Sequence, residues 1–100
     1  MEKDLRLIEL FELYQGLLTE RQRELFASYY LYDLSLSEIS EPEGKTRQNV
    51  HEALKKVKKK LLEYEKVLGV HQKNKELYSA VNDSESLSQL KQRILELIGR

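Results

Sequence analysis

The stretch DLSLSEISEPEGKTRQNVHEALKKVKKKLL, residues 33–62, decides the fold that this sequence predicts. It contains two helix-capping signals: Ser35 with Glu38 three residues later, and Thr46 just before an apolar repeat. They predict a short helix that cannot extend far past Pro42, then a tight turn containing glycine, then a longer helix. This order of elements is typical of a helix-turn-helix, in which the second helix enters the major groove of DNA and the first braces it.

The rest of the chain also favours helix. Leu, Glu, Lys, Gln and Arg dominate, and runs of alternating β-branched residues do not occur. Apolar residues at helical spacing predict helices over residues 2–15, 19–32, 46–68 and 86–98, and Thr19 with Gln22 is expected to form a capping box at the start of the second. The segment 71–78 is polar and gives only a weak helical signal, whereas Gly16 and Gly69 are expected to end helices in left-handed caps.

We therefore expect an all-α protein: a small helical bundle containing the helix-turn-helix, with a long recognition helix and a C-terminal helix. The 100 residues suit a single helical domain, and 40% of them are hydrophobic, enough for a buried core. In this organisation the helix-turn-helix covers about residues 35–62, and a C-terminal helical tail covers about residues 70–100.

Charge is unevenly distributed, although 17 basic and 17 acidic side chains balance overall. Four basic and ten acidic residues precede Lys45, whereas seven basic residues and one acidic residue lie between Lys45 and Lys60. A neutral total argues against a protein that coats nucleic acid. The concentrated basic segment is still compatible with a local contact to phosphates.

Helical geometry divides the long helix into two faces. At about 100° per residue, one side must face the core: Val50, Leu54, Val57 and Leu61. The other side and its flank carry the candidate nucleic-acid-binding residues: Arg47, Gln48, His51, Lys55, Lys58 and Lys59. Arginine and glutamine can recognise base edges, and lysines neutralise phosphates, so the first three of these residues are expected nearest the bases.

Two residues weaken this interpretation, and a simpler alternative exists. Glu52 lies within the proposed face and repels phosphate unless it accepts a hydrogen bond from a cytosine amine. Lys45 occupies the turn, where a helix-turn-helix normally buries an apolar side chain that locks its two helices together. In the alternative, the lysines form only the solvated face of an amphipathic helix.

Other functional classes have little support. His51 and His71 are the only histidines and lie in different segments, and cysteine is absent, so we expect no metal site. We find no nucleophile with an adjacent base and no glycine-rich phosphate loop, so we expect neither an enzyme nor a cofactor. No apolar run is long enough for a signal peptide or a membrane span, which predicts a cytoplasmic protein without membrane insertion.

A homodimer is expected, because a small domain with a long helix often gains stability by pairing. Leu61, Tyr64 and Leu68 could belong to the core or could pack against a second copy. The tail could likewise fold back on the bundle or bridge two chains, through the apolar residues Leu87, Leu90, Ile94 and Leu97. Tyr30 and Tyr32 are candidates for partly exposed partner contacts.

Several motifs in order resemble the YlxM family. They are LTERQREL at residues 18–25, the tyrosine pair at 29–30, DLSLSEI at 33–39, TRQNV at 46–50 and LEYEKVLG at 62–69. Residues 18–62 also resemble region 4 of bacterial sigma factors, a helix-turn-helix that recognises promoter DNA. The sequence departs from the family pattern at residues 41–45, where EPEGK replaces a helical turn ending in an apolar residue.

The resemblance implies an all-helical bacterial cytoplasmic protein with a helix-turn-helix like that of sigma region 4. In the family's pattern the recognition helix begins with Ser-Arg-Gln, which corresponds to Thr46, Arg47 and Gln48. Family genes lie beside those of signal-recognition-particle GTPases, which implies components of that particle as partners alongside DNA. The first hypothesis is a DNA-binding regulator. The second is an adaptor that does not bind DNA and uses the same basic face on a protein or on the particle's RNA.

Overall fold

The computed structural model describes residues 4–99, and over this range the chain is all-α, as predicted. Its α-helices are α1 (Leu5–Tyr14), α2 (Glu20–Phe26), α3 (Leu36–Ser40), α4 (Arg47–Leu68), α5 (Val70–Asp83) and α6 (Leu87–Ile98). Shorter helical turns follow α1, α2 and α3: a 3-10 turn at Gln15–Leu17, a π turn at Ala27–Leu31 and a 3-10 turn at Glu41–Glu43. No helix among the described residues is long and apolar enough to cross a membrane.

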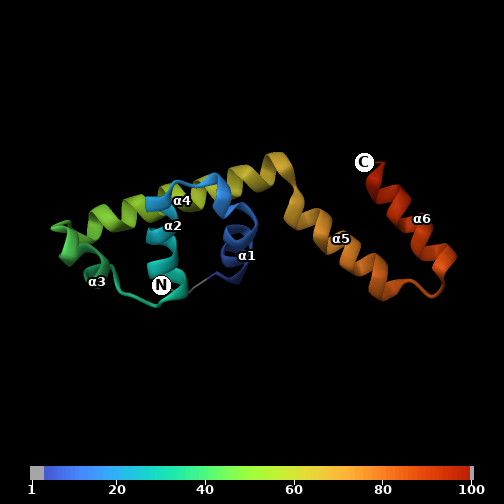
Figure 1. The fold of residues 1–100 in the computed structure, drawn as a ribbon, viewed down its shortest axis with the longest axis horizontal. Helices are drawn as coiled ribbons and strands as arrows, with labels where there is room; N and C mark the ends of the chain where they lie inside the picture. Colours follow the sequence, from blue (N-terminus) through green and yellow to red (C-terminus); the bar gives the residue numbers. More distant parts are fainter. Residues whose placement is uncertain (1–3, 100) are drawn as a thin grey trace.

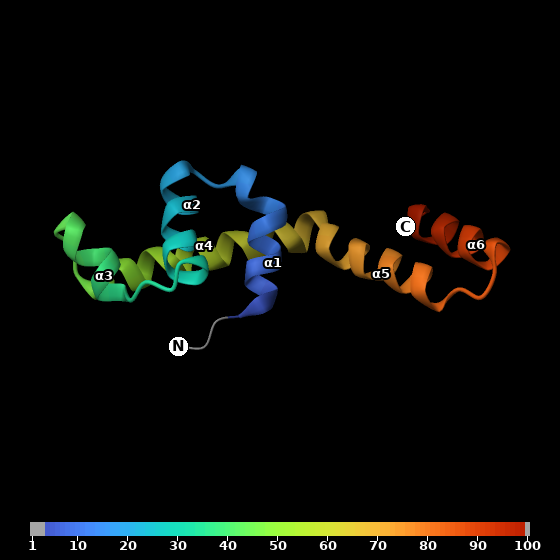
Figure 2. The same cartoon turned by 60° about the horizontal axis from the view of Figure 1, so that its bottom comes forward.

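Helix α4 is the axis of the molecule (Figure 1). Helices α1 and α2 lie across it, α3 lies near its N-terminal end, and α5 and α6 form a hairpin beyond its C-terminal end (Figure 2). The principal extents are 60 × 22 × 18 Å, and the Cα radius of gyration is 18.0 Å. A compact domain of this length has a radius of gyration of about 13 Å, so the shape is strongly elongated.

The core joins the inner faces of α1, α2 and α4. Phe26 is completely buried, and its ring stacks on Phe11 and Tyr30 with both pairs of ring centroids 4.4 Å apart. The predicted inner face of α4 is buried against these rings, and Leu61 is part of this core. Tyr64 packs against the core, and its hydroxyl donates to the carbonyl of Leu17 at 3.2 Å. Leu61 and Tyr64 therefore serve this chain's own packing, whereas Leu68, the third residue considered for a dimer contact, is 54% exposed.

Both predicted capping boxes are present. The Thr19 hydroxyl accepts from the Gln22 amide, and the Gln22 side chain accepts from the Thr19 amide. Ser35 and Glu38 make the same exchange at the start of α3. Thr46 caps α4 as predicted, and it also forms a capping box that was not predicted, because the Asn49 side chain takes the place of the usual Glu or Gln.

The second predicted helix, residues 19–32, differs from the structure at its C-terminal end. Regular α-helix stops at Phe26, and the next five residues form a π turn. The extra residue in this turn places Tyr29 and Tyr30 in the core and leaves Tyr32 71% exposed. The expectation of partial exposure is therefore wrong for Tyr30, whose ring belongs to the aromatic stack. Of the two tyrosines considered as partner contacts, only Tyr32 faces solvent.

Residues 71–78, which gave only a weak helical signal, lie within the continuous helix α5. The hydrophobic repeat is weak there because α5 buries only a narrow stripe, and Ala80 is its only buried residue among those described. Gly69 ends α4 in the left-handed conformation, with φ of 63°, as predicted. Gly16 does not take this conformation, because a 3-10 turn continues the helical path after α1.

Helix α6 folds back on α5 and not on the bundle (Figure 1). Leu97 is buried in this hairpin, with Leu90 and Ile94 half-buried, while Leu87 remains 67% exposed. The Lys73 ammonium donates to the carbonyl of Leu97 at 2.6 Å and so caps the C-terminal end of α6. Of the two arrangements considered for the tail, folding back on the bundle is therefore wrong.

Candidate nucleic-acid interface

A tight turn sets the direction of α4 relative to α3. After α3 the chain makes one 3-10 turn that contains Pro42, and Gly44 then reverses it in the left-handed conformation, with φ of 68°. The amide of Lys45 donates to the carbonyl of Ser40 at 2.9 Å and closes the turn. Helical backbone thus ends one residue after Pro42, as the sequence predicted, and α4 starts at once from its Thr46 cap.

The two faces of α4 lie where helical periodicity places them. Its inner residues are buried, namely Val50, Leu54, Val57 and Leu61. On the outer face and flank, Arg47, Gln48, Lys55 and Lys59 are exposed, whereas His51 and Lys58 are half-buried. One helix therefore presents all six predicted side chains, and their aliphatic stems can contribute to packing while the charged ends meet solvent.

The six residues border two separate hollows on the surface of α4. Arg47, Gln48 and His51 border the first, together with Leu36 at the start of α3. Lys55, Lys58 and Lys59 border the second, which is one to two turns further along the helix. The sequence analysis missed the other residues of this second hollow, Leu62, Glu63 and Lys66. An i, i+4, i+7, i+8, i+11 pattern from Lys55 through Lys59, Leu62 and Glu63 to Lys66 would have identified them.

Glu52 changes the chemistry of the first turns. Its Oε1 accepts from the Gln48 side-chain amide at 2.9 Å and lies 3.9 Å from the Lys55 ammonium. Gln48 is therefore held by its own helix, and it must release Glu52 before it can bond to a base edge. The Lys55 pair is exposed and long, so it costs little to break.

The length of α4 limits which residues can reach bases. Its 22 residues span about 33 Å, whereas the major groove is about 12 Å wide. Only the N-terminal turns, with Arg47, Gln48 and His51, can lie deep in the groove. The side chains of Lys55, Lys58 and Lys59 would lie over the sugar-phosphate backbone, where a flexible ammonium group is suited to neutralise phosphate.

At the other end of α4, a buried carboxylate joins three helices. Glu65 is 8% exposed and lies one turn before the end of α4. It accepts from the Tyr14 hydroxyl at 2.6 Å and from the amides of His71 and Gln72 at 3.0 Å each. The Tyr14 hydroxyl in turn accepts from the Val70 amide at 3.1 Å. Glu65 therefore caps the N-terminus of α5 and fixes the bend between α4 and α5 to α1.

This network shifts two pKa values. Burial alone would raise the pKa of Glu65, but hydrogen bonds from Tyr14 and from the amides of His71 and Gln72 outweigh it and hold the pKa below its ordinary value. Burial, together with the bond to the Glu65 carboxylate, raises the pKa of Tyr14. The sequence analysis missed this junction, because a glutamate in a helix gives no signal of burial by itself.

No group of metal-binding side chains occurs among residues 4–99. His71 instead pairs with Glu9, its Nε2 lying 2.6 Å from the Glu9 carboxylate, so it ties α5 to α1. His51 borders the first hollow on α4, far along the chain from His71.

The fold and this face define a small helix-turn-helix protein. A family profile described as "Putative helix-turn-helix protein, YlxM / p13 like" (UPF0122) matches residues 1–98, and the chain belongs to this family. A UPF0122 protein of Ureaplasma urealyticum serovar 10 is 44% identical over 88 residues, covering 85% of this chain and 89% of the relative.

Two further UPF0122 proteins extend the similarity to other bacteria. That of Halalkalibacterium halodurans is 40% identical over 94 residues, covering 94% of this chain and 81% of the relative. That of Symbiobacterium thermophilum is 50% identical over 64 residues, covering 64% of this chain and 60% of the relative. The family predicted from the ordered sequence motifs is thereby confirmed.

Proposed function

We propose that this chain is a cytoplasmic DNA-binding regulator, with α4 as the recognition helix, and that it acts by binding and not by catalysis. The observation that carries the proposal is the outer face of α4. A capped helix N-terminus presents Arg47 and Gln48 to solvent, and lysines follow on the same side over the next turns. This order, base-reading side chains first and phosphate-neutralising ones after, suits a helix that enters the major groove at its N-terminal end.

Salt dependence tests this proposal. If Lys55, Lys58 and Lys59 each neutralise one phosphate, the logarithm of the association constant should fall with the logarithm of salt concentration, with a slope of about −2.7. The double variant Lys55→Glu/Lys59→Glu should abolish binding to duplex DNA. The control Arg6→Glu/Lys56→Glu makes the same charge change at exposed residues outside both hollows and outside the hairpin, and it should bind like wild type. Equal binding by both variants would contradict the proposal.

A specific observation favours a second candidate function, an adaptor in the signal recognition particle pathway. Glu52 occupies the middle of the face and holds Gln48, which opposes phosphate binding and base reading together. In this function the basic face would bind an acidic protein surface or the particle's RNA. Glu52→Gln distinguishes the two functions. If the chain is a DNA-binding regulator, this variant should bind its specific duplex more tightly. If the chain is an adaptor, the variant's binding to duplex DNA should still not depend on the DNA sequence.

We also propose that two copies of the chain pair through the hairpin. Each helix of the hairpin leaves apolar side chains exposed: Tyr78 and Val81 of α5, and Leu87, Leu95 and Ile98 of α6, which helical spacing groups on one side of α6. A two-helix hairpin that leaves such a face in water is poorly stable alone, and a second hairpin would complete a four-helix arrangement. Sedimentation of Leu95→Glu/Ile98→Glu should show a monomer where wild type shows a dimer. A wild-type monomer at micromolar concentration would contradict pairing.

A further inference from the structure

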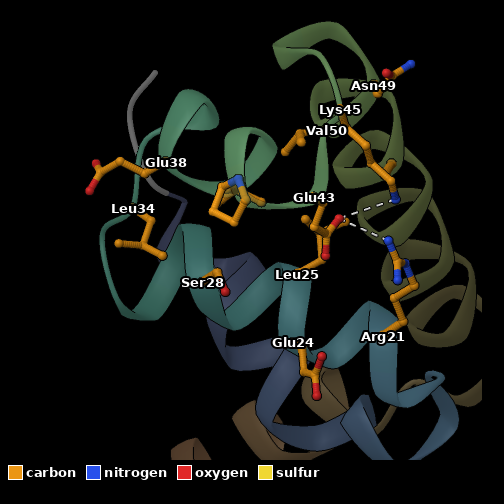
Figure 3. A pocket seen from close by; sticks show the side chains of 13 residues that line it. Arg21, Glu24, Leu25, Ser28, Leu34, Glu38, Glu43, Lys45, Asn49 and Val50 are labelled. Carbon is orange, nitrogen blue, oxygen red and sulfur yellow. Dashed lines mark hydrogen bonds and ion pairs between the residues drawn. The ribbon is translucent and has the colours of Figure 1, made fainter.

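A groove separate from the outer face of α4 lies between α2, α3 and α4 (Figure 3). Its volume is about 500 Å³, within the range of sites that bind ligands or partner side chains. Apolar side chains from every wall line it: Leu25, Leu34, Ile39, Pro42, Val50 and Ala53.

The groove is lined on one side by α2 and by the π turn that follows it. Arg21, Leu25 and Ser28 line it at i, i+4 and i+7, a stripe that spans about 10 Å, or two helical turns. Amphipathic helices that dock in grooves use anchors at this same spacing. The groove is therefore long enough to accept two successive apolar anchors from one partner helix.

Charge at one end of the groove is not balanced. A single oxygen of Glu43 pairs with both Arg21, at 3.0 Å, and Lys45, at 3.3 Å. In Figure 3 these three side chains converge, whereas the carboxylates of Glu24 and Glu38 point away from them. The lining as a whole has three acidic and two basic side chains, but at this end two cations share one carboxylate, so this end alone favours a single acidic group on the occupant.

The turn sequence explains why the groove is open. A helix-turn-helix normally fills the space between its two helices with an apolar side chain from the turn. Lys45 occupies that position here, and its ammonium pairs with Glu43 at the surface, with 42% of the side chain exposed. The apolar floor formed by the half-buried Leu25 and Ile39 is thus left for another side chain to cover.

We propose that this groove binds an amphipathic helix of a partner protein, with two apolar anchors on the floor and a carboxylate near Arg21 and Lys45. This goes beyond DNA binding and uses different residues. The candidate base-reading side chains border another hollow, so both sites can be occupied at once. Such a protein could hold a partner beside bound DNA.

Two designed helical peptides test this proposal. Both carry leucines at i and i+4 in an otherwise uncharged helix rich in alanine and glutamine; one has a single glutamate one turn beyond the leucines, and the other has a lysine there. Methyl NMR of the full chain would map their binding, using the methyl groups of Leu25, Leu34, Ile39, Val50 and Ala53. We expect shifts confined to these methyls and at least tenfold tighter binding of the glutamate peptide. Shifts centred on the hairpin or on the outer face of α4, or no binding by either peptide, would overturn the proposal.

Variants then test the two contributions separately. Arg21→Glu/Lys45→Glu should reverse the preference in favour of the lysine peptide, and Ala53→Phe should block both peptides by filling the floor. Lys75→Glu/Lys91→Glu is the control and should keep the preference of wild type. An unchanged preference in the charge-reversed variant would refute the acidic occupant. Because mapping on wild type needs no substitution, the proposal stays testable even if a variant folds poorly.

Discussion

Replacing Glu65 by alanine tests whether the junction between α1, α4 and α5 stabilises the protein. The carboxylate accepts three hydrogen bonds at 2.6 to 3.0 Å and is 8% exposed. A hydrogen bond to a charged group contributes about 1.5–3 kcal/mol. The two amides lie at the start of α5, where water can partly replace the carboxylate. We therefore expect a total loss of about 3–4 kcal/mol in the free energy of unfolding.

Urea unfolding followed by circular dichroism would measure this loss at neutral pH. Glu63→Ala is the matched control, since Glu63 is an exposed acid on the same helix, and it should cost less than about 0.5 kcal/mol. Tyr14→Phe removes only the hydroxyl and should cost about 1–2 kcal/mol. The reasoning is refuted if Glu65→Ala destabilises the protein no more than Glu63→Ala does.

The same site predicts the direction of a pH effect. The folded-state pKa of Glu65 lies below its ordinary value of 4.5, so its carboxylate stabilises the fold above pH 4.5. That contribution is lost as pH falls through the folded-state pKa. Wild type should therefore lose more stability than Glu65→Gln when the pH is lowered from 4.5. Parallel losses in the two proteins would show that Glu65 is not the group responsible.

Three further substitutions test other parts of the fold. Phe26→Ala should cost about 3–5 kcal/mol, because Phe26 is fully buried between two stacked rings, and a loss below 1 kcal/mol in urea unfolding would contradict that packing. Thr46→Ala should cost about 1 kcal/mol by removing the cap of α4, and Thr46→Ser, which keeps the hydroxyl, should stay close to wild type. Gly69→Ala should cost about 1–2 kcal/mol from its left-handed backbone alone, since no atom lies within 4 Å of the added methyl group. Gly16→Ala is its control and should be neutral or stabilising.

Local signals in the sequence were sufficient for most helix boundaries. The side chains of Thr19, Ser35 and Thr46 each bond to a backbone amide three residues away, so these caps depend on nothing outside their own turn. The inner face of α4 was equally predictable, because a repeat of three and four residues leaves only one side that can be buried. The same repeat placed the six candidate nucleic-acid-binding residues on the outer face and flank.

Features that depend on distant parts of the chain were not predictable. The burial of Glu65 could not be predicted from its own helix, because its partners come from elsewhere: Tyr14 of α1, 51 residues away, and two backbone amides of α5. Helix α5 gave only a weak signal because its buried stripe is small, with Ala80 as the one buried residue described in it. The groove likewise needs α2, α3 and α4 together, although Lys45 in the turn was a signal that the space would not be filled from within.

Selection of duplexes from a random DNA pool, at physiological salt, tests the central claim most directly. The full chain should enrich a defined sequence, and Arg47→Ala and Gln48→Ala should each relax the preference at particular base pairs by about 1–3 kcal/mol. Lys55→Ala should instead weaken binding to all sequences about equally. If wild type enriches no sequence, or if Arg47→Ala and Gln48→Ala leave the enriched sequence unchanged, α4 is not a recognition helix.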